Sequence, residues 1–313
     1  MELSYKQTLS RTLLCYTFLL GFTLLLQALL ASLCMTLWPQ ITKTDWYLWV
    51  LSYVPLYLVA VPLFFVLLRR LVPGSTRPAP HALTLAKQLQ SIVLSLGLAY
   101  LFNVVSMGFL LLFSKLTGLE VVNPLTAIQA ASSGWLNLLF GCIVAPVGEE
   151  FLFRKALYDK IGRFGQKPYV LLGGLIFGLF HGNLSQFLYA FALGVVFCYL
   201  YAKTGNLLYT IALHIIVNLF GLMLAPLAAQ STAGSTVLGA VVLACICGAC
   251  VIAWRGRSRI TLEPGESALP AHPARASFGN AGMVVYLVLC AVVIAFALLQ
   301  SALAPLLQMG GAA

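Results

Sequence analysis

The stretch Ala145-Pro-Val-Gly-Glu-Glu-Phe-Leu-Phe-Arg154 places two adjacent carboxylates and an arginine at the end of an apolar run that begins near Trp135. Ionisable side chains are costly inside a hydrocarbon layer, so their presence in such a run points to a function. The composition of the chain shows that this run crosses a membrane. Of the 313 residues, 61% are hydrophobic and only 8% are charged, against about 25% charged in an ordinary soluble domain.

Nine apolar runs are candidates for membrane-spanning helices, which need about 20 residues each. They cover residues 12–37, 46–68, 89–113, 135–157, 168–184, 186–202, 207–228, 236–254 and 282–305. The three runs between 168 and 228 are short and closely spaced, so we expect eight or nine spans. The sequence therefore predicts an all-α, polytopic transmembrane helix bundle.

The basic residues between the runs predict the orientation, because Lys and Arg accumulate on the cytoplasmic side. With the N-terminus inside, sixteen of the 18 basic residues lie on or near that side, and only Lys43 and Lys115 lie outside. Basic loops beside an anionic leaflet explain the net charge of +10. We therefore expect a multi-pass protein of the cell membrane, with the lipid bilayer around it and no nucleic-acid partner.

Two segments rich in Pro, Gly, Ala and Arg, residues 70–86 and 255–281, are predicted as cytoplasmic loops, because their composition cannot bury enough apolar surface to fold by itself. They divide the chain into an N-terminal two-span segment (1–87), a core (88–228) and C-terminal spans (229–313). The first apolar run is too long for a cleaved signal sequence and is predicted to remain as a span. The eight cysteines lie in or beside apolar runs and are predicted to be packing residues.

The core holds the candidate functional residues. Glu149 and Glu150 are the only carboxylates inside a predicted span, and His181 and His214 are the only histidines there. With a rise of about 1.5 Å per residue, Glu149 lies about 18 Å, His181 about 21 Å and His214 about 12 Å from the cytoplasmic ends of their helices. The three side chains are thus expected in one layer of the membrane, reachable from the cytoplasmic side.

Spacing within the helices suggests different roles for the two glutamates. Glu150 stands four residues before Arg154, the favoured order for an intrahelical ion pair, and can be neutralised in place. Glu149 is turned by about 100° from it and has no local partner. This favours Glu149 as a base and Glu150 as a structural anchor, although spacing alone allows the roles to be exchanged.

Two further pairs share a helical face through the same spacing of four: Phe177 with His181, and His214 with Asn218. A single histidine in a span is more often a packing or hydrogen-bonding residue, but the joint occurrence of these groups at one depth favours a site. The small residues Gly174, Gly178 and Gly182 are predicted to form a close helix-packing face.

Together, Glu149-Glu150-x-x-x-Arg154, Phe177-x-x-x-His181 and His214-x-x-x-Asn218 resemble the three-motif signature of the CPBP family of intramembrane proteases. That family includes the type II CAAX prenyl endopeptidases and bacterial relatives, some of them implicated in bacteriocin processing or immunity. The resemblance covers roughly residues 130–225. Each motif alone is weak, whereas all three in order are specific.

The resemblance implies an intramembrane endopeptidase of the glutamic type acting on a membrane-associated, prenylated or otherwise hydrophobic peptide. It implies Glu149 as the base that activates a water, His181 as a residue that holds this water, and His214 with Asn218 as donors to the oxyanion. Glu150, Arg154 and Phe177 would support the site. Nothing in the sequence indicates a groove for a prenyl group, so the substrate stays open.

Other interpretations of the same residues remain. Glu and His in spans would also serve a transporter or proton relay, and the motif could persist in a catalytically idle scaffold or immunity protein. Glu149, His181 and His214 could instead bind zinc and leave a position for water. We expect no cofactor, because the His-Glu-x-x-His helix of many zinc proteases is absent and Asn218 beside His214 suits an oxyanion hole better than a zinc site.

Overall fold

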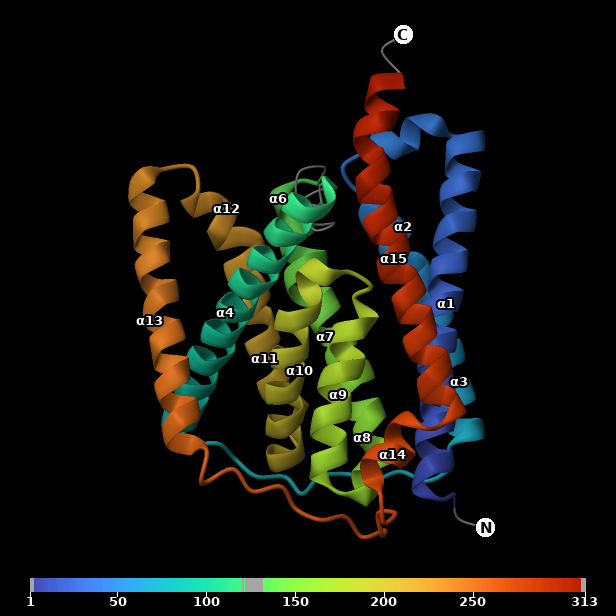
Figure 1. The fold of residues 1–313 in the computed structure, drawn as a ribbon, viewed down its shortest axis with the longest axis vertical. Coiled ribbons are helices and arrows are strands. Elements are labelled where there is room, and N and C mark those ends of the chain that lie inside the picture. The colour runs from blue at the N-terminus through green and yellow to red at the C-terminus, as the bar shows by residue number, and fades with distance from the viewer. Residues whose placement is uncertain (1–2, 120, 122–131, 311–313) are drawn as a thin grey trace.

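The computed structural model describes residues 3–119, 121 and 132–310 and folds them into a bundle of apolar helices (Figure 1). Within these residues, eight helices are long and apolar enough to cross a membrane: Tyr5–Leu37, Tyr47–Leu71, Leu85–Thr117, Gly134–Phe164, Leu184–Thr204, Leu207–Ala228, Thr232–Gly256 and Ala281–Ser301. A ninth apolar helix, Gln166–Phe180, is shorter. Each of the nine predicted runs corresponds to one of these helices, so the predicted all-α multi-pass bundle is confirmed.

Several of the nine segments are built from consecutive helical pieces. In chain order the elements are α1 (Tyr5–Leu37), η1 (Pro39–Lys43), α2 (Tyr47–Tyr53), η2 (Val54–Ala60), α3 (Val61–Leu71), α4 (Leu85–Thr117), α6 (Gly134–Leu136), η3 (Asn137–Val144), α7 (Ala145–Glu150), η4 (Phe151–Ala156), α8 (Leu157–Ile161), η5 (Gly162–Phe164), α9 (Gln166–Phe180), α10 (Leu184–Thr204), α11 (Leu207–Asn218), η6 (Leu219–Leu224), α12 (Ala225–Ala228), α13 (Thr232–Gly256), α14 (Pro273–Phe278) and α15 (Ala281–Gly310). The fourth span thus runs from α6 to η5 and is longer than the predicted 135–157.

Polar residues at the helix ends explain where the helices begin and stop. Side chains that accept a hydrogen bond from the first helical turn cap α1, α4, α10, α11 and α13; they belong to Ser4, Thr84, Asn183, Asn206 and Ser231. Gly118 and Gly205 end α4 and α10 in the left-handed conformation that glycine adopts without strain. The ends of these membrane helices are therefore set by the same capping residues as the ends of helices in soluble proteins.

Wide π-helical turns interrupt three of the spans, at η2, η3 with η4, and η6. Both η3 and η6 end directly before an Ala-Pro pair, Ala145-Pro146 and Ala225-Pro226. Proline has no N–H and its ring presses on the preceding turn, so a wider turn there relieves the clash. Such turns are frequent at functional sites, and here η3 and η6 contact each other.

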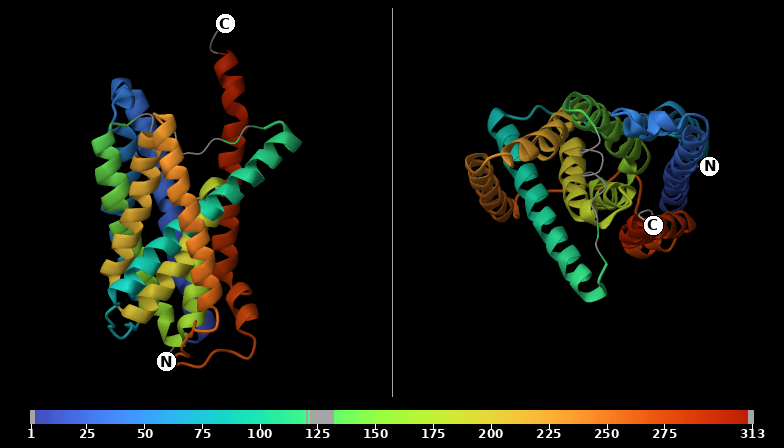
Figure 2. Two further views of the ribbon diagram at one scale, coloured as in Figure 1. Left: turned by 90° about the vertical axis from the view of Figure 1, so that its left-hand side faces the viewer. Right: turned by 90° about the horizontal axis from the view of Figure 1, so that it is seen from above.

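Seen from above, the α9–α10 hairpin lies between α4 on one side and α15 with α1 on the other (Figure 2). It packs against α4 through α10, while α13 packs on α4, and α1 packs against both α3 and α15. A side chain at Gly174 or Gly178 would collide with α10, so this part of the predicted small-residue face is confirmed. Helices α1 and α15, from the first and the last predicted segment, pack together, and the division of the chain into three segments stays a prediction.

The two predicted loops run along the end of the bundle where α1 begins (Figure 1). They are attached to the core there: the Thr76 and His81 amides donate to the carbonyls of Asp159 and Thr204, and Ser267 donates to Arg163. The second loop was expected to carry no structure, and this is wrong in part, since it contains α14. Asn280 stabilises that short helix by donating to the Ala276 and Ser277 carbonyls.

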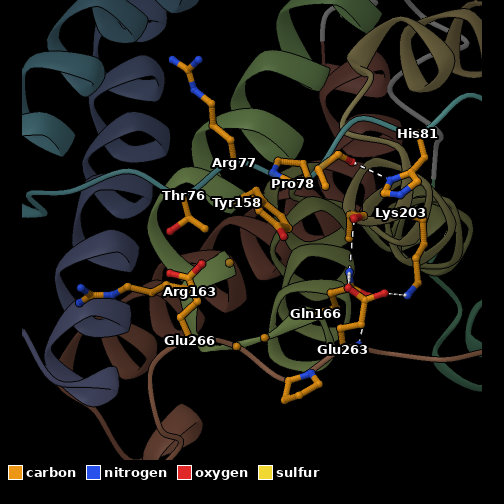
Figure 3. A pocket seen from close by; sticks show the side chains of 16 residues that line it. Thr76, Arg77, Pro78, His81, Tyr158, Arg163, Gln166, Lys203, Glu263 and Glu266 are labelled. Carbon is orange, nitrogen blue, oxygen red and sulfur yellow. Dashed lines mark hydrogen bonds and ion pairs between the residues drawn. The ribbon is translucent and has the colours of Figure 1, made fainter.

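A cavity of about 260 Å³ lies between these loops and the core (Figure 3). Glu263 lines this cavity, and its carboxylate accepts hydrogen bonds from Lys203 at 2.7 Å and from the Gln166 amide at 3.3 Å. The adjacent lysine holds the pKa of the Glu263 carboxyl below its usual range. None of the predicted site residues lines this cavity. Both basic and acidic side chains line it, among them Arg77, Lys203 and Glu266.

We expect Gly97→Leu to separate α4 from α13. A Cβ at Gly97 would collide with the Cys245 carbonyl oxygen and would lie 2.5 Å from the Ala249 Cβ. Overpacking of this kind costs about 1–3 kcal/mol, so the midpoint of thermal unfolding in detergent should fall. Gly108→Leu on the same helix is the matched control, because nothing lies within 4 Å of a Cβ there. Equal stability of the two variants would contradict the observed helix contact.

Candidate active site

Glu150 and Arg154 form a fully buried ion pair in the fourth span. The Arg154 Nε lies 3.0 Å from Glu150 Oε2, and both side chains have 0% exposure. The predicted pairing is therefore present. The guanidinium lies 4.2 Å from the ring centre of Phe177 and 5.2 Å from that of Phe197. Cation–π contacts of this kind stabilise a buried guanidinium, and the supporting role of Phe177 stays a prediction.

His214 of α11 lies between the two glutamates. Its Nδ1 is 2.8 Å from Glu150 Oε1, and its Nε2 is 3.6 Å from Glu149 Oε2. An ionised carboxylate only accepts hydrogen bonds, so Nδ1 carries the hydrogen that Glu150 accepts. The opposite nitrogen then faces Glu149 across a gap too long for a direct hydrogen bond.

Glu149 differs from its neighbour in exposure. Its side chain is 24% exposed, whereas that of Glu150 is 0% exposed. The preceding Gly148 packs directly against the ring of Tyr57 from η2, leaving no room for a Cβ. The Glu149 carboxylate also lies within electrostatic range of Tyr57 and His181. One glutamate is thus locked and the other is accessible, a distinction that spacing alone left open.

His181 lies at the tip of the α9–α10 hairpin and not inside a helix. A span over 168–184 was predicted, and this is wrong at its end: α9 stops at Phe180 because Gly182 turns the chain at φ +65° and Asn183 starts α10. The His181 Nδ1 is 2.8 Å from the Phe177 carbonyl oxygen. Since that oxygen only accepts, Nδ1 is the protonated nitrogen of the neutral ring and Nε2 is left as an acceptor.

Asn218 reaches a different partner from His214. Its Nδ2 donates to the Gly141 carbonyl oxygen at 2.9 Å and joins the end of α11 to η3. The sequence predicted that the two residues share one helical face, and in the structure both side chains bond to residues of the fourth span. However, the bond to Gly141 occupies one of the two amide hydrogens of Asn218, and the Nδ1 hydrogen of His214 is bound by Glu150.

Sequence reasoning missed two groups beside these residues. Tyr57 comes from the N-terminal spans, and the only sequence feature that could have pointed to it is Gly148, against which it packs. Asn183, Gln186 and Tyr189 form a hydrogen-bonded chain at the start of α10, with the Glu149 charge in electrostatic range of Tyr189. The sequence feature that could have pointed to them is the helix-capping residue Asn183, which also marks the turn after His181.

A metal site was the alternative for Glu149, His181 and His214. Among the residues that the structure describes, no three His, Cys, Asp or Glu side chains are gathered as a metal-binding group. Glu149 and His214 nevertheless face each other, and both are possible ligand types.

Comparison with known proteins supports the resemblance over the core. The family model described as "Type II CAAX prenyl endopeptidase Rce1-like" matches residues 131–220, which include every predicted site residue. The chain is 33% identical over 107 residues to the protein named "Putative membrane peptidase YdiL" of Bacillus subtilis (strain 168), covering 33% of this chain and 43% of that protein. The resemblance to the CPBP family is thereby confirmed for this segment.

A second relative is "UPF0177 protein YxdF" of Lactococcus lactis subsp. lactis (strain IL1403), 31% identical over 80 residues, or 25% of this chain and 44% of that protein. The chain thus spans less than half of the length of each of these two relatives. No solved structure matches it.

We expect Arg154→Met to lower the free energy of unfolding by about 3–5 kcal/mol, because it leaves the Glu150 charge buried without its partner. The change should appear as a large drop in the thermal midpoint in detergent. Lys155→Met is the matched control: Lys155 makes the same i,i+4 contact to Asp159, but with 41% of its side chain exposed, so its loss should cost about 1 kcal/mol or less. Similar losses in both variants would contradict an anchoring role for the buried pair.

Proposed function

We propose that this chain is an intramembrane endopeptidase that hydrolyses a peptide bond of a membrane-associated or hydrophobic polypeptide. The match of residues 131–220 to a membrane endopeptidase family supports the class of reaction. One observation supports the site: a partly exposed Glu149 faces the same imidazole that a fully buried Glu150 holds. Such a pair combines an available base with a fixed electrostatic frame, which is what activation of a water requires.

In the proposed reaction, Glu149 accepts a proton from a water as the water oxygen attacks the substrate carbonyl carbon. His181 would hold this water through Nε2, the nitrogen that its bond to Phe177 leaves as an acceptor. The attack converts the carbonyl oxygen to an oxyanion. Glu149 then returns the proton to the amide nitrogen as the C–N bond breaks, so the products are a carboxylate and an amine.

Donors near the carbonyl oxygen would stabilise the oxyanion. His214 would be one when its Nε2 also carries a hydrogen, because the bond between Nδ1 and Glu150 fixes the ring with Nε2 next to Glu149. The second amide hydrogen of Asn218 is another, and loss of one such donor typically lowers turnover by about 10² to 10³. Both groups lie on the helix that contacts η3 and α7, which fixes them relative to Glu149.

Glu149→Gln should abolish cleavage while the protein stays folded, since the substitution is close to isosteric and removes only the proton acceptor. We suggest reconstitution in proteoliposomes with internally quenched peptides that carry an apolar segment of about 20 residues, and product analysis by mass spectrometry. Glu266→Gln in the loop at the cavity is the control for loss of a carboxylate outside the site. Cleavage by the Glu149→Gln variant at the parental rate would remove Glu149 as the base.

An unreactive wild-type protein in this assay, across the peptide pool and native membrane proteins, would favour a transporter or an idle scaffold over a peptidase. Proton flux across the same proteoliposomes, lost in Glu149→Gln, would identify the proton relay.

Activity is expected to survive exhaustive chelation, because the proposed base acts on water without a metal. The measurement is the cleavage rate before and after dialysis against a strong chelator, with zinc content determined in parallel. Stoichiometric zinc that is lost together with activity, and restores it on return, would replace the glutamate mechanism by a metal-dependent one.

A further inference from the structure

A chain of hydrogen bonds at the start of α10 has a defined direction. The Asn183 Oδ1 accepts from the backbone amide of Gln186 at 2.9 Å, and its Nδ2 donates to the His181 carbonyl oxygen at 2.8 Å. A backbone amide only donates and a carbonyl only accepts, so the two ends of the Asn183 amide cannot be interchanged. The cap is therefore oriented by the hairpin itself.

The fixed orientation of the Asn183 amide also determines the orientation of the Gln186 amide and of the Tyr189 hydroxyl. The Asn183 Nδ2 also donates to Gln186 Oε1 at 2.6 Å, so the atom that Gln186 presents to Tyr189 is its Nε2, 2.9 Å from the phenol oxygen. The Tyr189 oxygen must accept this hydrogen bond. Its own O–H hydrogen then remains to be donated, and no acceptor for it lies among the described residues.

Tyr189 is placed to use that hydrogen at the candidate site. It lies on α10 shortly after the His181 turn, and it packs against the same apolar cluster as Leu213 and Val217, the α11 residues next to His214 and Asn218. His214 and Asn218, the oxyanion donors proposed above, each use one hydrogen elsewhere: His214 donates to Glu150, and Asn218 donates to Gly141. A donor that is oriented in advance costs no reorganisation when charge develops, which is the property an oxyanion donor needs.

We propose that Tyr189 is a catalytic residue that donates its O–H hydrogen bond to the oxyanion, and that Asn183 and Gln186 are positioning residues that hold the phenol in this donor orientation. The proposal rests on the peptidase function proposed above. The phenol keeps its proton throughout; it contributes a hydrogen bond to the substrate oxygen and takes no part in the transfer between water, Glu149 and the leaving amine.

Tyr189→Phe removes the donor and keeps the ring. It should lower kcat by about 10²-fold or more, with KM and the thermal midpoint close to those of the parent, for a peptide that the wild-type protein cleaves. Tyr5→Phe is the matched control, since that buried tyrosine bonds Ser277 at 2.6 Å, where α1 meets α14 and away from the site. The kcat of this control variant should be unchanged.

Gln186→Glu tests the positioning chain. The carboxylate can still accept from Asn183, but it presents an acceptor to Tyr189 and should capture the phenol hydrogen. It is therefore expected to lower kcat to about the level of Tyr189→Phe, and the double variant should be no slower than either single one, because both remove the same donor.

The outcomes separate this proposal from the one on which it depends. A wild-type enzyme that cleaves, a Glu149→Gln variant that does not, and a Tyr189→Phe variant with parental kcat would overturn the role of Tyr189 and leave the peptidase standing. Independent, multiplicative losses in the double variant would overturn the positioning chain. A wild-type protein without cleavage would remove both proposals together.

Discussion

The buried contact between Glu150 and Arg154 is the constraint on which the rest of the site depends. Both side chains are shielded from solvent, so each needs the other to avoid an uncompensated charge. The contact also organises its surroundings, because Arg154 lies against Phe177 of α9 and Phe197 of α10, while Glu150 holds His214 of α11. One ion pair therefore joins four helices at a single level of the bundle, and Glu149 is presented beside this frame.

The backbone next to the Glu150–Arg154 pair is irregular in the segments that carry the candidate site residues. Wide turns before Ala145-Pro146 and Ala225-Pro226 shape the two helices that carry the glutamates and His214. The α9–α10 hairpin turns back at His181 instead of crossing the bundle as one long helix. Irregular backbone at membrane depth is tolerated where it packs against protein, and here α4, α11, η4 and α15 contact the hairpin. Gly174 and Gly178 allow α9 to approach α10 closely within this hairpin.

Much of this could be predicted from the sequence, for physical reasons that also explain the failures. The spans were predictable because long apolar runs have one solution in a bilayer, and the Glu150–Arg154 pair followed from a spacing of four on one helix. The position of His214 between both glutamates was not, since contacts between helices depend on packing that local periodicity does not encode. The end of α9 was missed because Gly182 was interpreted as part of a packing stripe and not as a turn. Tyr189 was missed because a lone aromatic residue in a span carries no signal until its hydrogen-bond partners are known.

The central claim is that Glu149 acts as a base on a water in the interior of the bundle. Single-turnover cleavage in H₂¹⁸O, with excess enzyme in proteoliposomes, tests it most directly. If water is the nucleophile, mass spectrometry should find one ¹⁸O atom in the new carboxyl group from the first turnover and none in the peptide that contains Glu149. A first-turnover product without label, together with ¹⁸O in Glu149, would show that the glutamate itself attacks the carbonyl and would contradict the account.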